Sequence, residues 1–114
     1  MPYMNMAMPV IPGKEADARR VAGEISGARR AEFSAFQAPS DTSRETWTLQ
    51  ETPAGTFLLV WFDAVDIQRG LEDLATGDDE FTGWFRTQIH EITGVDLTDP
   101  DGAPSVETLL DWSA

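Results

Sequence analysis

Hydrophobic and polar positions alternate at the start of the chain. In residues 3–11 three methionines fall on one side, and Tyr3, Asn5 and Ala7 fall on the other. A period of two is typical of a strand, because successive side chains of a strand point to opposite faces. The chain is therefore predicted to begin with a strand.

The next segment changes to a helical period. From residue 14 to about residue 36, apolar side chains such as Val21 recur every three or four positions, which predicts one long amphipathic helix. Arg29 and Glu32 interrupt this apolar stripe. Two interpretations stay open: the helix kinks or unwinds near Gly27 and turns both residues to water, or the two residues form a partly buried pair near a cleft.

Two further strands follow a loop rich in turn-forming residues. Residues 44–52 alternate apolar Trp47 and Leu49 with polar side chains, as expected of an edge strand with one polar face. In residues 56–63 both sets of alternate positions are apolar. This strand is predicted to lie centrally in the sheet and to be covered on both faces.

The turn between these two strands predicts their register. Pro53 and Gly55 suit a hairpin with a three-residue loop. In that register Trp47 lies opposite Trp61 on one face of the sheet. Glu45 is two positions before Trp47, so it points to the same face.

Two short helices are predicted in the second half of the chain. Asp66 is a suitable N-cap for the first, and Gly77 suits a left-handed position at its end. Asp78 or Asp79 can cap the second, which Gly94 terminates. Together they form a broken second helical layer.

Residues 95–114 are predicted to form a loop and then a fourth strand. Pro100 and Gly102 belong to the loop. A short helix is the alternative for the last part, because Glu107–Leu110 contains good helix formers. The alternating positions of the strand are Val106, Thr108, Leu110 and Trp112.

The order of elements predicts the fold class. Strand, helix, strand, strand, helix, strand is the ferredoxin-like βαββαβ arrangement, an α+β fold with an antiparallel sheet, here as one domain over residues 1–114. Helices on one side would leave the other face of the sheet open to water. Because the central strand is apolar on both sides, we expect a second copy to cover that face, giving a homodimeric α/β barrel.

Charge and composition exclude several classes of partner. Twenty acidic and eight basic residues give a net charge of −12, which repels nucleic acid and anionic membranes. The chain has no cysteine and therefore no disulfide or thiolate nucleophile. The first residues do not resemble a secretion signal, and no run of about 18 apolar residues could span a bilayer. A cytoplasmic location is expected.

A family resemblance rests on the segments RETWTLQETPAG and DDEFTGWFRTQIHEITGVDL. Over residues 6–98 the chain resembles an uncharacterised family of the dimeric α/β-barrel, ferredoxin-like group. That group is distantly similar to antibiotic-biosynthesis, cofactor-independent and haem-degrading monooxygenase domains. The resemblance implies a fold and no assigned reaction. Three positions, Asn5, Trp84 and His90, are similar in kind to residues of those monooxygenases.

The sequence contains little that points to catalysis. His90 is the only histidine, which excludes a multi-His metal site, and its helical angle predicts that it points to solvent or to an interface. The acidic segment 97–108 lacks the ligand pattern of a calcium loop. No motif of a nucleophilic hydrolase or nucleotide-binding protein is present. We therefore expect no metal and no cofactor, and no catalytic residue is identified.

If the face of the second strand that carries Glu45 lies under the helices, Arg29 can reach Glu45 while it pairs with Glu32 on its own helix, which gives one polar network. Convergent charges beside aromatic side chains are typical of a small-ligand site. We expect a structural or ligand-binding dimer that takes a small apolar or aromatic molecule. The alternative is a cofactor-independent or haem-type monooxygenase that uses the barrel cavity. The candidate ligand-binding residues are Asn5, Arg29, Glu32, Glu45, Trp47, Trp61 and Trp84.

Overall fold

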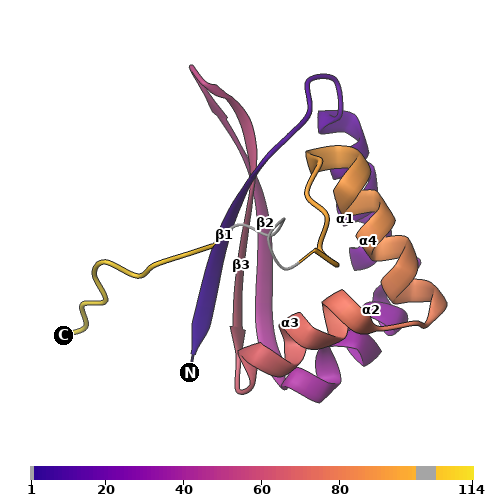
Figure 1. Ribbon diagram of the computed structural model, residues 1–114, viewed down its shortest axis with the longest axis vertical. Coiled ribbons are helices and arrows are strands. Elements are labelled where there is room, and N and C mark those ends of the chain that lie inside the picture. The colour runs from indigo at the N-terminus through magenta and orange to yellow at the C-terminus, as the bar shows by residue number, and fades with distance from the viewer. Residues whose placement is uncertain (1, 100–104) are drawn as a thin grey trace.

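A computed structural model describes residues 2–99 and 105–114 of the chain and shows an α+β fold. One three-stranded antiparallel sheet carries all the helices on one of its faces (Figure 1). The predicted α+β class and antiparallel sheet are confirmed. The elements in chain order are β1 (Tyr3–Pro9), α1 (Glu15–Ser26), α2 (Arg30–Gln37), the 3-10 turn η1 (Ala38–Ser40), β2 (Thr42–Thr52), β3 (Gly55–Ala64), α3 (Ile67–Thr76) and α4 (Glu80–Thr93).

The sheet has the strand order β1-β3-β2. The central strand is β3, which carries apolar side chains on both faces, as predicted. The strand β2, which has one polar face, is at an edge, also as predicted. Leu58, Val60 and Phe62 of β3 are buried on the side of the helices. On its other side Leu59 and Trp61 remain half-buried, with no helix over them.

The β2–β3 hairpin corrects the predicted register. Its loop has two residues, because Thr52 pairs with Gly55. The Thr52 hydroxyl stabilises this tighter turn: it accepts a hydrogen bond from the Ala54 N–H at 3.1 Å and donates one to the Gly55 carbonyl at 2.8 Å. Trp47 consequently pairs with Val60, not with Trp61. A register shift of one residue sends the two indoles to opposite faces of the sheet.

The predicted long helix is broken into α1 and α2 at Gly27, as the first of the two interpretations required. At the break the Arg29 N–H donates to the Glu24 carbonyl at 2.7 Å. This bond spans five residues, one more than the bond of an α-helix, so the turn is wider. A Cβ at Gly27 would lie 2.9 Å from the Gly23 carbonyl oxygen, so a larger residue could not take this position without a shift. The break gives α2 a new direction, independent of α1.

Caps define the two later helices. The Asp66 carboxylate accepts from the Arg69 N–H at 3.0 Å, and the Asp79 carboxylate accepts from the Thr82 N–H at 3.1 Å, as predicted for N-caps. The backbone of Gly94 is in the left-handed conformation, with φ of 78°. Gly77 is not: its φ is −57°, because the chain leaves α3 in an extended conformation and runs directly to the start of α4.

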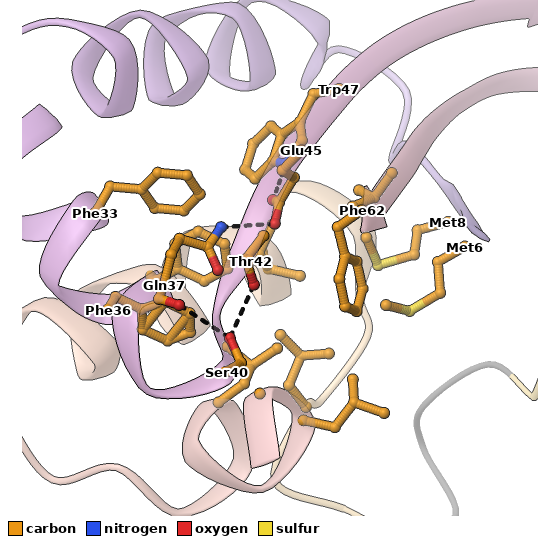
Figure 2. Close-up of a pocket in the computed structure, with 17 residues that line it drawn as sticks. Met6, Met8, Phe33, Phe36, Gln37, Ser40, Thr42, Glu45, Trp47 and Phe62 are labelled. Carbon is orange, nitrogen blue, oxygen red and sulfur yellow. Dashed lines mark hydrogen bonds between the residues drawn. The ribbon is translucent and has the colours of Figure 1, made fainter. Parts of the chain in front are cut away.

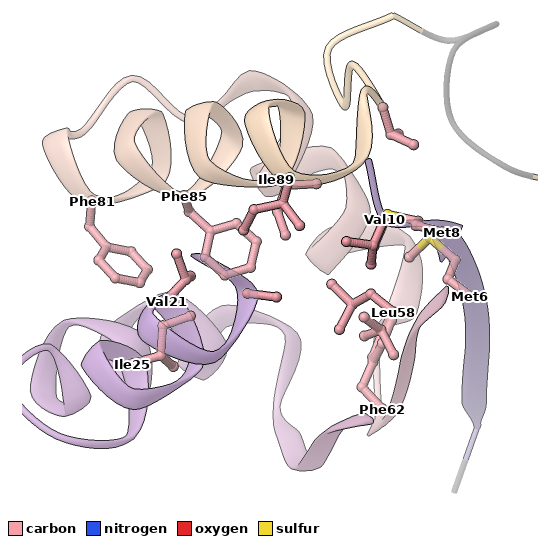
Figure 3. Packing of buried hydrophobic residues seen from close by; sticks show 14 of the residues in the cluster. Met6, Met8, Val10, Val21, Ile25, Leu58, Phe62, Phe81, Phe85 and Ile89 are labelled. Carbon is pink, nitrogen blue, oxygen red and sulfur yellow. The ribbon is translucent and has the colours of Figure 1, made fainter. Parts of the chain in front are cut away.

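The hydrophobic core lies between the sheet and the helices (Figure 3). Its buried members include Met6, Met8 and Leu58 from the sheet and Val21 and Ile89 from α1 and α4. The last two are 0% and 1% exposed. Burial of these side chains is the main force that holds the helical layer on the sheet.

The C-terminal segment corrects the prediction of a fourth strand. Residues 105–114 form neither a strand nor the alternative helix, and they leave the molecule on the side of the sheet away from the helices (Figure 1). The sheet therefore has three strands in the described chain, and the full βαββαβ order is absent there. A strand needs a hydrogen-bonded neighbour, and residues 105–114 form no backbone hydrogen bond to the described part of the chain. The predicted loop positions Pro100 and Gly102 lie outside the described residues.

Among the described residues, no helix has the length and hydrophobicity needed to cross a bilayer.

Candidate functional site

A small cavity lies between the sheet and α2, α3 and α4 (Figure 2). Its volume is about 60 Å³. The wall is mainly apolar and carries four aromatic rings that contact one another around Phe85. These rings belong to Phe33, Phe36, Trp47 and Phe85.

Glu45 is the ionisable group in this wall (Figure 2). One carboxylate oxygen accepts a hydrogen bond from Gln37 Nε2 at 2.8 Å, and the other accepts from Trp47 Nε1 at 2.7 Å. Both donors are neutral, and no ion pair to Glu45 is found in the described part of the chain. Glu45 is thus a carboxyl group held beneath the helices without a compensating cation.

Burial raises the pKa of the Glu45 carboxyl, because removal from water disfavours its charged form. The hydrogen bonds from Gln37 and Trp47 lower the pKa and only partly oppose this effect. The carboxyl therefore exchanges its proton at a pH above the usual range for glutamate.

The α2–β2 connection positions this part of the wall. Ser40, which is buried, donates its hydroxyl hydrogen bond to the Gln37 carbonyl at 3.1 Å and lies 2.8 Å from the Thr42 hydroxyl. Asp41 has φ of 52°, which reverses the chain so that β2 starts below the end of α2. The Ser40 carbonyl also accepts from the Asp66 N–H at 3.0 Å, which brings the start of α3 to the cavity.

Arg29 forms a separate cluster at the surface. It donates two hydrogen bonds of 3.2 Å to Glu80 and lies 3.5 Å from Glu32. Its guanidinium carbon is 4.2 Å from the centre of the Trp84 ring, a cation–π arrangement. The pKa of Arg29 is raised, first through its hydrogen bonds to Glu80. The predicted pairing with Glu32 is confirmed.

The predicted contact between Arg29 and Glu45 is wrong. The break at Gly27 turns Arg29 toward the first turn of α4, where Glu80 lies, and away from β2. Glu45 is left to the neutral donors described above. The residues expected in one polar network therefore belong to two separate sites. One is the charged cluster around Arg29 at the surface, and the other is the Glu45 carboxyl beneath the helices.

The seven candidate residues fall into three places. Glu45 and Trp47 line the cavity, whereas Arg29, Glu32 and Trp84 form the surface cluster. The other two candidates, Asn5 and Trp61, are register partners on the sheet face without helices.

The positions suggested by the monooxygenase resemblance are not brought together. Asn5 is exposed on the sheet face away from the helices, and Trp84 lies on α4 under Arg29. His90 is exposed on the same helix, as predicted. Among the described residues no group of three or more potential metal ligands is found.

Sequence reasoning missed most of the cavity wall. Helical spacing could have identified Phe33, Phe36 and Phe85, since each lies on the inner side of its helix. No local pattern marks Gln37 as a partner of Glu45. That contact depends on how α2 is directed after the break at Gly27.

Comparison with known proteins found no matching family model, no matching curated protein and no matching solved structure.

Proposed function

We propose that the protein binds a small ligand in the cavity beside Glu45. The observation that carries this proposal is a partly buried carboxyl group, without a cationic partner in the described chain, in a wall of aromatic and aliphatic side chains. A few polar groups in an apolar concave site are typical of ligand-binding pockets. A purely structural role is less favourable, because only two hydrogen bonds from neutral donors offset the cost of removing this carboxylate from water.

The cavity limits what the ligand can be. Its volume of about 60 Å³ is well below the roughly 300 Å³ of the smallest drug-sized pockets. A molecule of a few non-hydrogen atoms fits this space without movement of the helices, whereas a haem does not. Glu45 offers acceptor oxygens, and the net charge of −12 attracts cations. The best match is a small apolar molecule with a hydrogen-bond-donating head, such as an ammonium group.

The indole N–H of Trp47 reports directly on this site, because it donates to Glu45. In NMR titrations we expect n-propylamine to shift the Trp47 indole resonance in a saturable way, 1-propanol to shift it less and propionate not to shift it. The response should be lost in Glu45→Gln, which keeps the size of the side chain. The Trp61 indole, on the opposite sheet face, is the internal control.

The ligand proposal would be abandoned if none of the three probes gave a saturable shift at Trp47. It would also fail if Glu45→Gln responded to n-propylamine as the wild type does, since the carboxyl would then not be the anchor.

We also propose that the protein is a homodimer that joins the open sheet faces of two copies. Phe57, Leu59 and Trp61 form an apolar stripe along the central strand on that face, and polar Thr46 and Thr48 lie beside it on β2. Patches of this kind on a single chain indicate an interaction surface. Two such sheets packed face to face would make the α/β barrel suggested by the family resemblance.

Light scattering at micromolar concentration should give twice the 12.6 kDa mass of the chain. Since each copy carries a charge of −12, added salt should tighten the dimer by screening the repulsion. A mass of one chain at every concentration and salt level would exclude the dimer.

A further inference from the structure

The C-terminal segment, residues 105–114, is unusually apolar for a chain exposed to water. Leu109 is 87% exposed, Leu110 81% and Trp112 77%. No backbone hydrogen bond holds these ten residues to the described part of the chain. We call residues 105–114 the C-terminal arm.

The arm extends on the same side as the open sheet face (Figure 1). Residues 106–110 and the outward residues Asn5, Ala7, Leu59 and Trp61 line one wide groove of about 860 Å³. The arm therefore borders the open face without covering it. Anything seated on that face is also beside the arm.

The pattern of the arm fits a strand at a sheet edge. In an extended arm Glu107, Leu109 and Asp111 lie on one side, which carries the charges, and the other side is largely apolar. The sheet has two open edges, on β1 and β2. The side that would be buried carries Val106, Thr108, Leu110 and Trp112.

We propose that two copies of this chain exchange their C-terminal arms, each arm pairing as a fourth strand with an open sheet edge of the other copy. The proposal rests on the homodimer inferred above. Three observations converge on a second copy as the partner. The arm leaves its own sheet on the face where a second copy would sit, its large apolar side chains are exposed in the single chain, and both sheet edges have unpaired backbone groups.

Hydrogen exchange of the full-length protein tests the exchange of arms. Amides of residues 105–114 should exchange at the rate of an unstructured peptide in a dilute, monomeric sample, because they form no backbone hydrogen bond within the described part of the chain. At concentrations where light scattering shows a dimer, they should slow at least about tenfold. The mass is measured in the same samples, so the dimer and the arm are judged separately.

Three other outcomes would each contradict the proposed exchange of arms. A dimer whose arm amides stay unprotected would leave the homodimer intact and remove the arm from it. A monomer at all concentrations would remove both. Protection that does not depend on concentration would show that the arm folds onto its own chain.

A pair of variants provides a second readout. Leu110→Ser combined with Trp112→Ser removes the apolar side of the arm, and it should weaken the dimer at least about tenfold. Glu107→Gln changes the opposite side and should alter the dissociation constant by less than about twofold. Both side chains replaced in the double variant are exposed in the single chain, so folding of the monomer should be unaffected. A double variant that dimerises as tightly as the wild type would refute the proposal.

Discussion

Replacing Leu58 with alanine is expected to lower the free energy of unfolding by about 2–5 kcal/mol, independently of protein concentration. Leu58 is 2% exposed and lies on the central strand, facing the helices. Its register partners Met8 and Leu49 lie on the same side and also pack in or against the core. Loss of the side chain leaves a cavity that rigid neighbours on both strands cannot fill.

The next residue of the same strand, Leu59, is the matched control. It points to the open face and is half-buried in one chain. In a monomer Leu59→Ala should cost less than about 1 kcal/mol. If the open faces form a dimer, its cost should instead grow with protein concentration, because it weakens association.

Urea denaturation of both variants at two protein concentrations measures these effects through the transition midpoints. Equal losses for Leu58→Ala and Leu59→Ala at low concentration would contradict the assignment of the two faces. A loss below about 1 kcal/mol for Leu58→Ala would contradict its place in the core.

Glu45→Gln is expected to become steadily more stable relative to the wild type as the pH rises above the usual range for glutamate. Burial raises the pKa of Glu45 in the folded state, so between its unfolded and folded pKa the folded protein holds more protons than the unfolded chain. Stability from this group is then fully present below the unfolded pKa and is lost as the pH rises through the folded pKa. Each unit of pKa shift corresponds to about 1.4 kcal/mol.

The measured quantity is the difference in free energy of unfolding between Glu45→Gln and the wild type, from about pH 4 to pH 8. The NH2 group of a glutamine amide cannot accept a hydrogen bond, so one of the donors that face Glu45 loses its acceptor in the variant at every pH. Only the change of the stability difference with pH is therefore compared. Glu51→Gln, an exposed residue of the same strand, should show a difference that hardly changes over this range. A flat difference for Glu45→Gln would show that the carboxyl stays hydrated, and the proposed ligand anchor would lose its physical basis.

The candidate site was only partly predictable from the sequence. Glu45 and Trp47 were correctly placed on one face of the same strand, because alternation along a strand is a local property. That this face lies under the helices came from the structure. Arg29 was assigned to the wrong partner, because its direction depends on how the chain turns at Gly27. Gln37 was missed because its contact joins the end of α2 to β2, and no spacing in the sequence encodes that distance.

For the fold, too, features with local causes were predictable from the sequence, and features that depend on long-range contacts were not. By itself the sequence determined the three strands, the central position of β3 and the Asp66 cap, and it limited the second cap to Asp78 or Asp79. Each of these depends on residues a few positions apart, through side-chain period, capping or backbone freedom.

The tertiary structure decided what depends on the meeting of distant segments. The pairing of β2 with β3 fixed which side chains lie opposite one another: Trp47 pairs with Val60, so Trp61 lies on the other face of the sheet. The packing of α2 and α3 against β2 enclosed Glu45 with neutral donors and formed the cavity. The C-terminal arm has a strand pattern but pairs with neither open edge of its own sheet. The physical reason is the same in each case: a local pattern specifies which side of an element is apolar, and only packing specifies what that side touches.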